Sequence, residues 1–153
     1  MTNMSPGDID SKVIAQRAFW ISQMIDSLKD LHLEGKVAFL ADKHKIAAAE
    51  SYLRRALEAL FDIGRHILAK RFAFPATEYK EIAKGLSDKG VLVEKETELM
   101  RKMAGYRNRM VHFYHEITPE ELHEICLYHI HEIEWLANRL VQWTKEHQDR
   151  VIN

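Results

Sequence analysis

Residues 105–114 bring together side chains that can exchange protons and bind anions. The segment reads Gly-Tyr-Arg-Asn-Arg-Met-Val-His-Phe-Tyr and contains Arg107, Asn108, His112 and Tyr114. A His with an ordinary pKa near ~6.5 can accept or donate a proton at neutral pH. Arg is always charged and can stabilise a phosphate through its planar fork of N–H groups. Asn108, one helical turn before His112, could orient the imidazole or bind phosphate. These groups suit metal-free cleavage of RNA, in which a ribose 2′-hydroxyl attacks the neighbouring phosphate.

Helical geometry places the polar side chains of this segment on a shared arc. At about 100° per residue, Arg107 and Tyr114 lie about 20° apart, and Asn108 and His112 lie about 40° apart. Val111 lies among them, and an apolar residue in a polar arc is typical of a contact surface or a cleft. The arc faces away from an expected core stripe of Leu99, Met103, Tyr106, Met110 and Phe113.

The angle between the two most reactive side chains predicts a dimer. Arg107 and His112 diverge by about 140° on an ideal helix, so one subunit alone makes a poor site. A two-fold homodimer that apposes this arc would supply two Arg and two His to one cleft, with its interface next to Val111. The Arg-x-x-x-x-His spacing is by itself a weak signal, and it is also compatible with a purely structural role.

The nine His residues do not form a metal-binding pattern. Ferritin-like sites need a Glu-x-x-His pair on each of two helices, and the chain has one, Glu120 with His123. Asp62 and His66 share a helix face, which predicts a local hydrogen bond. No Gly-rich phosphate loop and no Ser or Cys nucleophile motif is present, so we expect no metal and no cofactor.

Charge is segregated in the second half of the chain. The whole protein has a net charge of -1, so attraction to nucleic acid must come from a local patch. Between Glu98 and Glu116 there is no acidic residue, whereas residues 116–138 contain six Glu and neither Lys nor Arg. Two interpretations remain open. The two segments pair within the fold, or the basic segment forms a groove that holds phosphate.

Apolar spacing in steps of three and four predicts an all-α protein. Asp42 is an expected N-cap, and Thr118 followed by Pro119 is a strong helix start. The short connections favour an antiparallel bundle of four to five helices. The expected helices cover residues 8–33, 42–71, 77–86, 94–114 and 118–150.

Length and composition predict one globular domain spanning residues 1–153, with residues 1–7 as a flexible tail. The sequence starts without a basic and apolar leader, and it has no apolar run of the ~18 residues that cross a membrane. The single Cys126 suits a reducing compartment. We therefore expect a cytoplasmic protein that does not contact the membrane.

The motif Arg107-Asn108-x-x-x-His112-x-Tyr114 resembles the Arg-Asn-x-x-x-His-x-Tyr signature of HepT-type HEPN proteins, the toxins of MNT–HepT toxin–antitoxin pairs. Residues 54–68 are similar to the second helix of that family, and the resemblance spans most of the chain. It implies an all-α, homodimeric, metal-independent endoribonuclease with RNA as substrate. Its partner would be a minimal nucleotidyltransferase antitoxin that adds AMP to the motif Tyr.

Carried over by position, the resemblance makes Arg107 and His112 catalytic, Asn108 supporting and Tyr114 the site of AMP addition. Phe113 stands where relatives often have Gly, and its bulk removes no catalytic group but bears on the shape of the cleft and on access to Tyr114. The alternative is a catalytically silent HEPN module that binds RNA, nucleotide or a nucleotidyltransferase. The presence of all four motif residues favours the enzyme.

Overall fold

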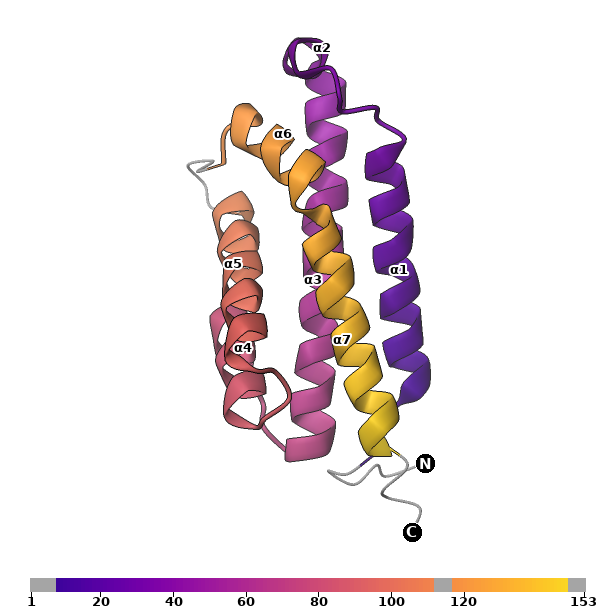
Figure 1. Cartoon of the computed structure of the whole chain (residues 1–153), viewed down its shortest axis with the longest axis vertical. Helices are drawn as coiled ribbons and strands as arrows, with labels where there is room; N and C mark the ends of the chain where they lie inside the picture. The colour runs from indigo at the N-terminus through magenta and orange to yellow at the C-terminus, as the bar shows by residue number, and fades with distance from the viewer. Residues whose placement is uncertain (1–7, 112–116, 149–153) are drawn as a thin grey trace.

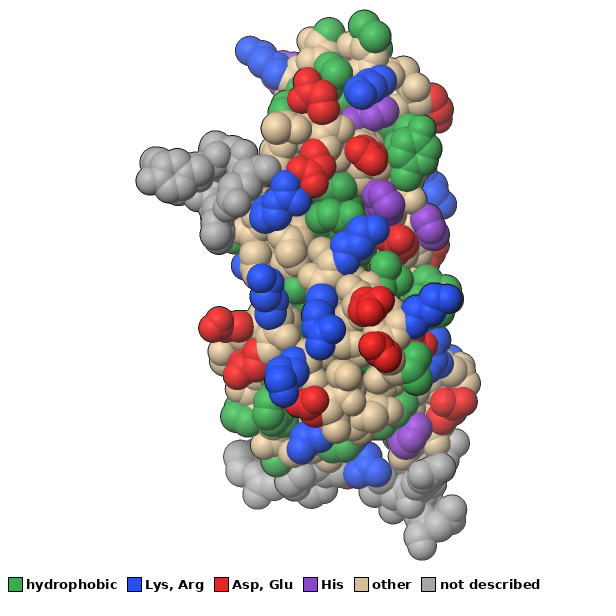
Figure 2. All heavy atoms as spheres, turned by 60° about the vertical axis from the view of Figure 1, so that its left-hand side comes forward, with side chains coloured by type: hydrophobic (Ala, Val, Ile, Leu, Met, Phe, Trp, Pro, Cys, Tyr) green, Lys and Arg blue, Asp and Glu red, His purple; other side chains and the backbone are tan. Residues whose placement is uncertain are grey.

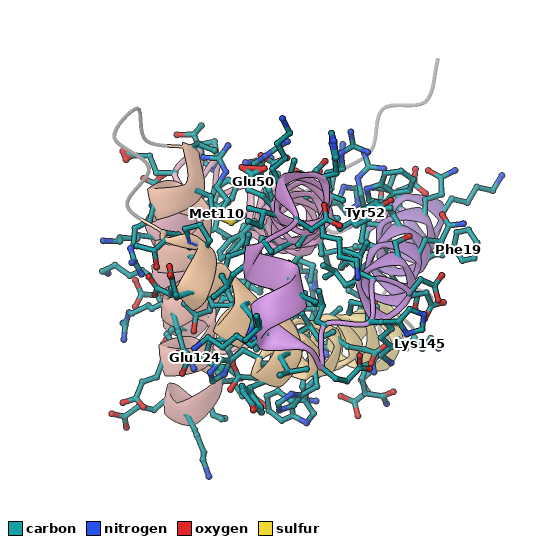
Figure 3. All side chains as sticks on the ribbon, turned by 90° about the horizontal axis from the view of Figure 1, so that it is seen from above. Phe19, Glu50, Tyr52, Met110, Glu124 and Lys145 are labelled. Carbon is teal, nitrogen blue, oxygen red and sulfur yellow. The ribbon has the colours of Figure 1, made fainter. Side chains whose placement is uncertain are left out.

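The computed structural model describes residues 8–111 and 117–148, and in that part of the chain it contains seven α-helices and no strand. The long helices run side by side along the length of the molecule, and α2 and α6 lie across one end (Figures 1 and 3). The all-α prediction is confirmed, with more helices than the four to five expected. The helices are α1 (Ser11–Lys29), α2 (Lys36–Leu40), α3 (Lys43–Phe72), α4 (Tyr79–Asp88), α5 (Glu94–Val111), α6 (Pro119–Tyr128) and α7 (Ile130–Gln148).

Helix α3 is the centre of the bundle and contacts each of the other six described helices. It begins as predicted, because the Asp42 carboxylate accepts hydrogen bonds from the backbone N–H groups of His44 and Lys45 at 3.0 and 3.1 Å. The apolar spacing of this segment predicts a stripe on one helix face, and the stripe is buried except for half-buried Ile46. Its members are Ile46, Ala49, Leu53, Ala56, Leu60, Ile63 and Ile67. The helix ends at Phe72 and is followed by Ala73 in the left-handed conformation (φ 51°).

Several helix ends differ from the sequence prediction. Helix α1 starts at Ser11 because Asp10 caps it, accepting the N–H of Lys12 at 3.0 Å. It ends at Lys29, and His32 then adopts a left-handed turn (φ 54°). The five-residue α2 was not predicted, since it is too short to show a period. Helix α4 lies two residues later than expected.

The prediction of one continuous helix over residues 118–150 is wrong. The start is correct, because Thr118 Oγ1 accepts the N–H of Glu121 at 3.1 Å. The helix then breaks at His129, whose ψ of -4° departs from helical geometry. Helix α6 packs on α2 and α3 at the end of the bundle, whereas α7 lies along α1 and α3, so the two segments need different axes. Cys126 and Ile130 are buried on either side of the break, whereas Tyr128 between them is 62% exposed.

The predicted helix over residues 94–114 is confirmed as far as Val111, and its last three residues lie outside the described part of the chain. Met103, Tyr106 and Met110 of its expected stripe are buried. Within the described residues, no helix combines the length and apolar character needed to cross a membrane.

Candidate functional site

The guanidinium of Arg107 is held on two sides at the surface of the bundle. Its Nε and Nη2 donate to Oε2 of Glu58 on α3, at 3.4 and 3.2 Å. Its Cζ lies 4.4 Å from the ring centroid of Tyr79, the first residue of α4. The side chain is 26% exposed, so the cation keeps access to solvent. Three helices, α3, α4 and α5, therefore fix the orientation of one Arg.

Both supports of Arg107 are themselves held by neighbours. The second carboxylate oxygen of Glu58 accepts from Nη1 of Arg54 at 3.5 Å, one helical turn away. The Tyr79 ring stacks on buried Phe61 with centroids 4.6 Å apart and an angle of 15° between the planes. Burial raises the pKa of the Tyr79 phenol, although the charge of Arg107 opposes the shift.

Arg107 and Asn108 line an open hollow of about 520 Å³ together with Arg65 and residues 77–80. Arg65 is neutralised by Asp62, with Nη1 and Oδ1 2.8 Å apart. Lys80 is exposed and has no ion pair with another described residue. The hollow is lined by three cationic side chains from three helices and by one carboxylate, Glu78, and this excess of cations suits an oxyanion such as phosphate.

The two interpretations of the charge pattern each hold for part of the basic segment. Arg109 makes a bidentate ion pair with Glu121 of α6, in which Nη1 donates to Oε2 at 2.9 Å and Nη2 donates to Oε1. Lys102 approaches Glu132 of α7 at 3.3 Å. These cations pair with the acidic segment within the fold, whereas Arg107 pairs with Glu58 of α3. Figure 2 shows the resulting mixture of Lys and Arg with Asp and Glu side chains over the α5 face.

The structure brings two of the four predicted site residues, Arg107 and Asn108, to one hollow. His112 and Tyr114 lie outside the described residues. Val111, which the sequence places outside the core stripe, is 46% exposed.

The roles of Glu58 and Tyr79 were not predicted from the sequence. Glu58 has a detectable signal, since it stands four residues after Arg54 on the flank of the α3 stripe. Tyr79 has none, because it meets Arg107 through packing of α4 on α5.

The predicted hydrogen bond between Asp62 and His66 is wrong. Asp62 pairs with Arg17 of α1 at 3.4 Å and with Arg65. His66 Nε2 accepts the backbone N–H of Asp10 at 3.0 Å, so it ties the start of α1 to α3. Each of the two side chains has a partner in α1 or at its N-cap, and the spacing within one helix cannot reveal that partner.

Comparison with known proteins gives one family and one fold. The model of the family described as "Ribonuclease HepT-like" matches residues 21–140. No curated protein matches the sequence. The fold is similar to that of a chain in the structure of the tri-AMPylated HEPN toxin of Shewanella oneidensis in complex with MNT antitoxin (TM-score 0.75, 20% identity, 84% of this chain and 96% of that chain). A chain of a toxin–antitoxin with AMP-PNP is also similar (TM-score 0.73, 19% identity, 84% of this chain and 97% of that chain).

At these identities the solved structures show the same helical fold, and they do not assign a role to any residue. The family match covers most of the chain, and it includes α5 with Arg107 and Asn108. On this match the chain belongs to the HepT-like ribonuclease family.

Proposed function

We propose that this protein is the toxin of a toxin–antitoxin pair, a metal-independent endoribonuclease that uses Arg107 and His112. The main support for the proposal is the fixed orientation of the Arg107 side chain at the protein surface. It stands in the Arg-Asn-x-x-x-His-x-Tyr motif, and its guanidinium is oriented by Glu58 and Tyr79 at a hollow that suits phosphate. Such a cation stabilises the charge that develops on phosphate oxygens during cleavage.

In the proposed reaction, His112 accepts the proton of a ribose 2′-hydroxyl, and that oxygen attacks the adjacent phosphorus. The bond from phosphorus to the 5′ oxygen of the next nucleotide breaks, and a protonated His gives this oxygen its proton. The products are a 2′,3′-cyclic phosphate and a free 5′-hydroxyl. Arg107 binds the phosphate oxygens, and Asn108 supports the imidazole or the phosphate.

The test is digestion of a defined RNA by purified protein in EDTA, followed by analysis of the product ends. Arg107→Ala and His112→Ala should each lower kcat by ~10²-fold or more, the usual scale for an acid–base or oxyanion group. Arg101→Ala, at an exposed position on the same helix, is the matched control and should cleave like wild type. Full inhibition by EDTA, or wild-type rates in His112→Ala, would refute the assignment. RNA binding without cleavage by wild type would instead support the silent HEPN module.

We further propose that an MNT-type nucleotidyltransferase antitoxin silences the enzyme at Tyr114. The phenol oxygen of Tyr114 would attack the α-phosphorus of ATP and release pyrophosphate. The bound AMP would place an anion and a bulky adenosine beside Arg107 and exclude RNA. Support comes from the similar fold of a toxin that is described as AMPylated and in complex with MNT antitoxin.

After co-expression with the antitoxin, mass spectrometry should find AMP on Tyr114 of the wild-type protein. Tyr114→Phe should remain an active ribonuclease and escape silencing. AMP on another residue, or silencing of Tyr114→Phe, would refute this role. The proposed active form is a cytoplasmic homodimer of one-domain subunits, consistent with the exposed Val111 at the end of α5.

A further inference from the structure

A second hollow, of about 520 Å³, lies between α1 and α3, and two of its lining residues pair with residues that line the Arg107 hollow. Its lining includes Glu58, the residue that orients Arg107, and Asp62, whose two oxygens bind Arg17 on one side and Arg65 on the other. Arg65 in turn lines the Arg107 hollow. One extended ligand could therefore occupy both hollows by crossing α3 at Glu58 and Asp62.

The groove is lined by two Arg and two carboxylates, and one of the two Arg side chains can still bind an anionic group. Arg55 lines it, is exposed, and has no ion pair with another residue that the structure describes. Arg17 shares the Asp62 carboxylate with Arg65. The Glu58 carboxylate already accepts from Arg54 and Arg107. The acidic side chains are thus committed to partners within the fold, while Arg55 remains available to a phosphate.

The groove also offers a surface for a nucleobase. Trp20 lines it and is 40% exposed. The neighbouring Phe19 is 64% exposed and points away from the bundle on α1 (Figure 3). Aromatic side chains beside Arg are the usual platform for unpaired bases, and the amide of Gln16 adds hydrogen-bonding capacity. A purely apolar partner would leave Arg55 and Gln16 unsatisfied.

We propose that the groove between α1 and α3 binds single-stranded RNA next to the cleavage site, with a base stacked on Trp20 and a backbone phosphate on Arg55. The inference rests on the proposed ribonuclease function and extends it from the reacting phosphate to the neighbouring nucleotides. It predicts that the enzyme binds a longer strand more tightly than a dinucleotide.

Binding is measured first, in the His112→Ala background, by fluorescence anisotropy of a fluorescein-labelled RNA of about 12 nucleotides. Trp20→Leu and Arg55→Gln should each raise Kd by at least about fivefold, and Trp20→Phe should retain most of the affinity because it can still stack. Trp135→Leu and Lys95→Gln are the matched controls. Trp135 and Lys95 line a separate hollow between α5 and α7, and Trp135 is 47% exposed. Both control variants should bind the RNA like wild type.

Cleavage kinetics then separate this subsite from the reacting groups. With His112 intact, the same two substitutions should raise KM for the long RNA and leave cleavage of a dinucleotide unchanged. Unchanged Kd values in both variants would overturn the proposal. A loss of affinity that accompanies a change of oligomeric state in sedimentation would also overturn it, in favour of a protein contact. If wild type cleaves no RNA, the proposed function fails, and the Kd values still decide whether the groove binds RNA.

Discussion

Glu58 decides which N–H groups of Arg107 remain for a substrate. A guanidinium has five N–H donors, and the Glu58 carboxylate accepts from Nε and Nη2. The remaining donors can bind phosphate while Glu58 holds the plane of the group and Tyr79 covers one face. Glu58 therefore acts as a positioning residue, and it also opposes the approach of an anion.

These two effects predict a split response in Glu58→Gln. Without the carboxylate, Arg107 is less well oriented, so kcat should fall by about tenfold, the factor that corresponds to ~1.4 kcal/mol. KM for RNA should fall as well, because a competing negative charge is gone. Steady-state kinetics measure both constants. Glu50→Gln is the control. It removes a carboxylate on the same helix whose Oε1 lies 3.7 Å from Nε of Arg54. An unchanged kcat in Glu58→Gln would refute the positioning role.

A second residue-scale prediction concerns His66 and pH. Burial, with smaller contributions from Lys70 and Arg17 and opposed by Asp10, lowers the pKa of His66 from its ordinary value of 6.5. The unfolded chain therefore binds the proton more readily. The stabilisation is complete above pH about 6.5 and is lost as pH falls from there towards the folded pKa. Protonation also removes the lone pair that accepts the N–H of Asp10.

Urea denaturation at about pH 7.5 and about pH 5.5 tests this. The free energy of unfolding should decline with acidification more in wild type than in His66→Gln, whose side chain can accept a hydrogen bond without titrating. Equal pH dependence of the two proteins would show that His66 does not contribute.

At the scale of elements, Gly64 allows α4 to pack closely on α3. A Cβ at this position would lie 2.9 Å from Cγ2 of Ile82 and 3.0 Å from Cδ1 of Leu86. Both of these atoms belong to buried side chains of α4. Helix α4 begins with Tyr79, so the close approach at Gly64 helps to place the ring under Arg107.

Gly64→Ala should therefore destabilise the protein by about 1–3 kcal/mol, the usual cost of an overpacked core. Gly105→Ala is the matched control on α5. A Cβ there meets nothing within 4 Å, so Ala should stabilise the helix by about 0.5–1 kcal/mol. Chemical denaturation measures both effects. Equal stabilities of Gly64→Ala and wild type would mean that α4 can shift without cost.

At the scale of the whole molecule, the proposed site combines residues from two subunits. In a heterodimer of the two variants, the His112→Ala subunit supplies Arg107 and the Arg107→Ala subunit supplies His112. One site with both residues is then intact. Two inactive variants should regain activity when mixed, up to a fraction that reflects the share of heterodimers. Mixing followed by an RNA digest measures this, and sedimentation reports the oligomeric state. A monomer at micromolar concentration, or no gain on mixing, would contradict a shared site.

The sequence by itself determined the helical class, the helix starts at Asp42 and Thr118, and the position of Arg107 and Asn108 on one helix. These features are local. Backbone hydrogen bonds link residues four apart, and burial of one helix face repeats with the same period, so both leave a pattern within a short stretch of chain.

Only the tertiary structure decided which groups surround Arg107. Glu58 stands 49 positions earlier in the chain, and Tyr79 reaches the guanidinium because α4 packs on α3 and α5. The break at His129 likewise follows from the different neighbours of α6 and α7. Contacts of this kind depend on how helices are arranged in space, and spacing along one helix carries no information about them.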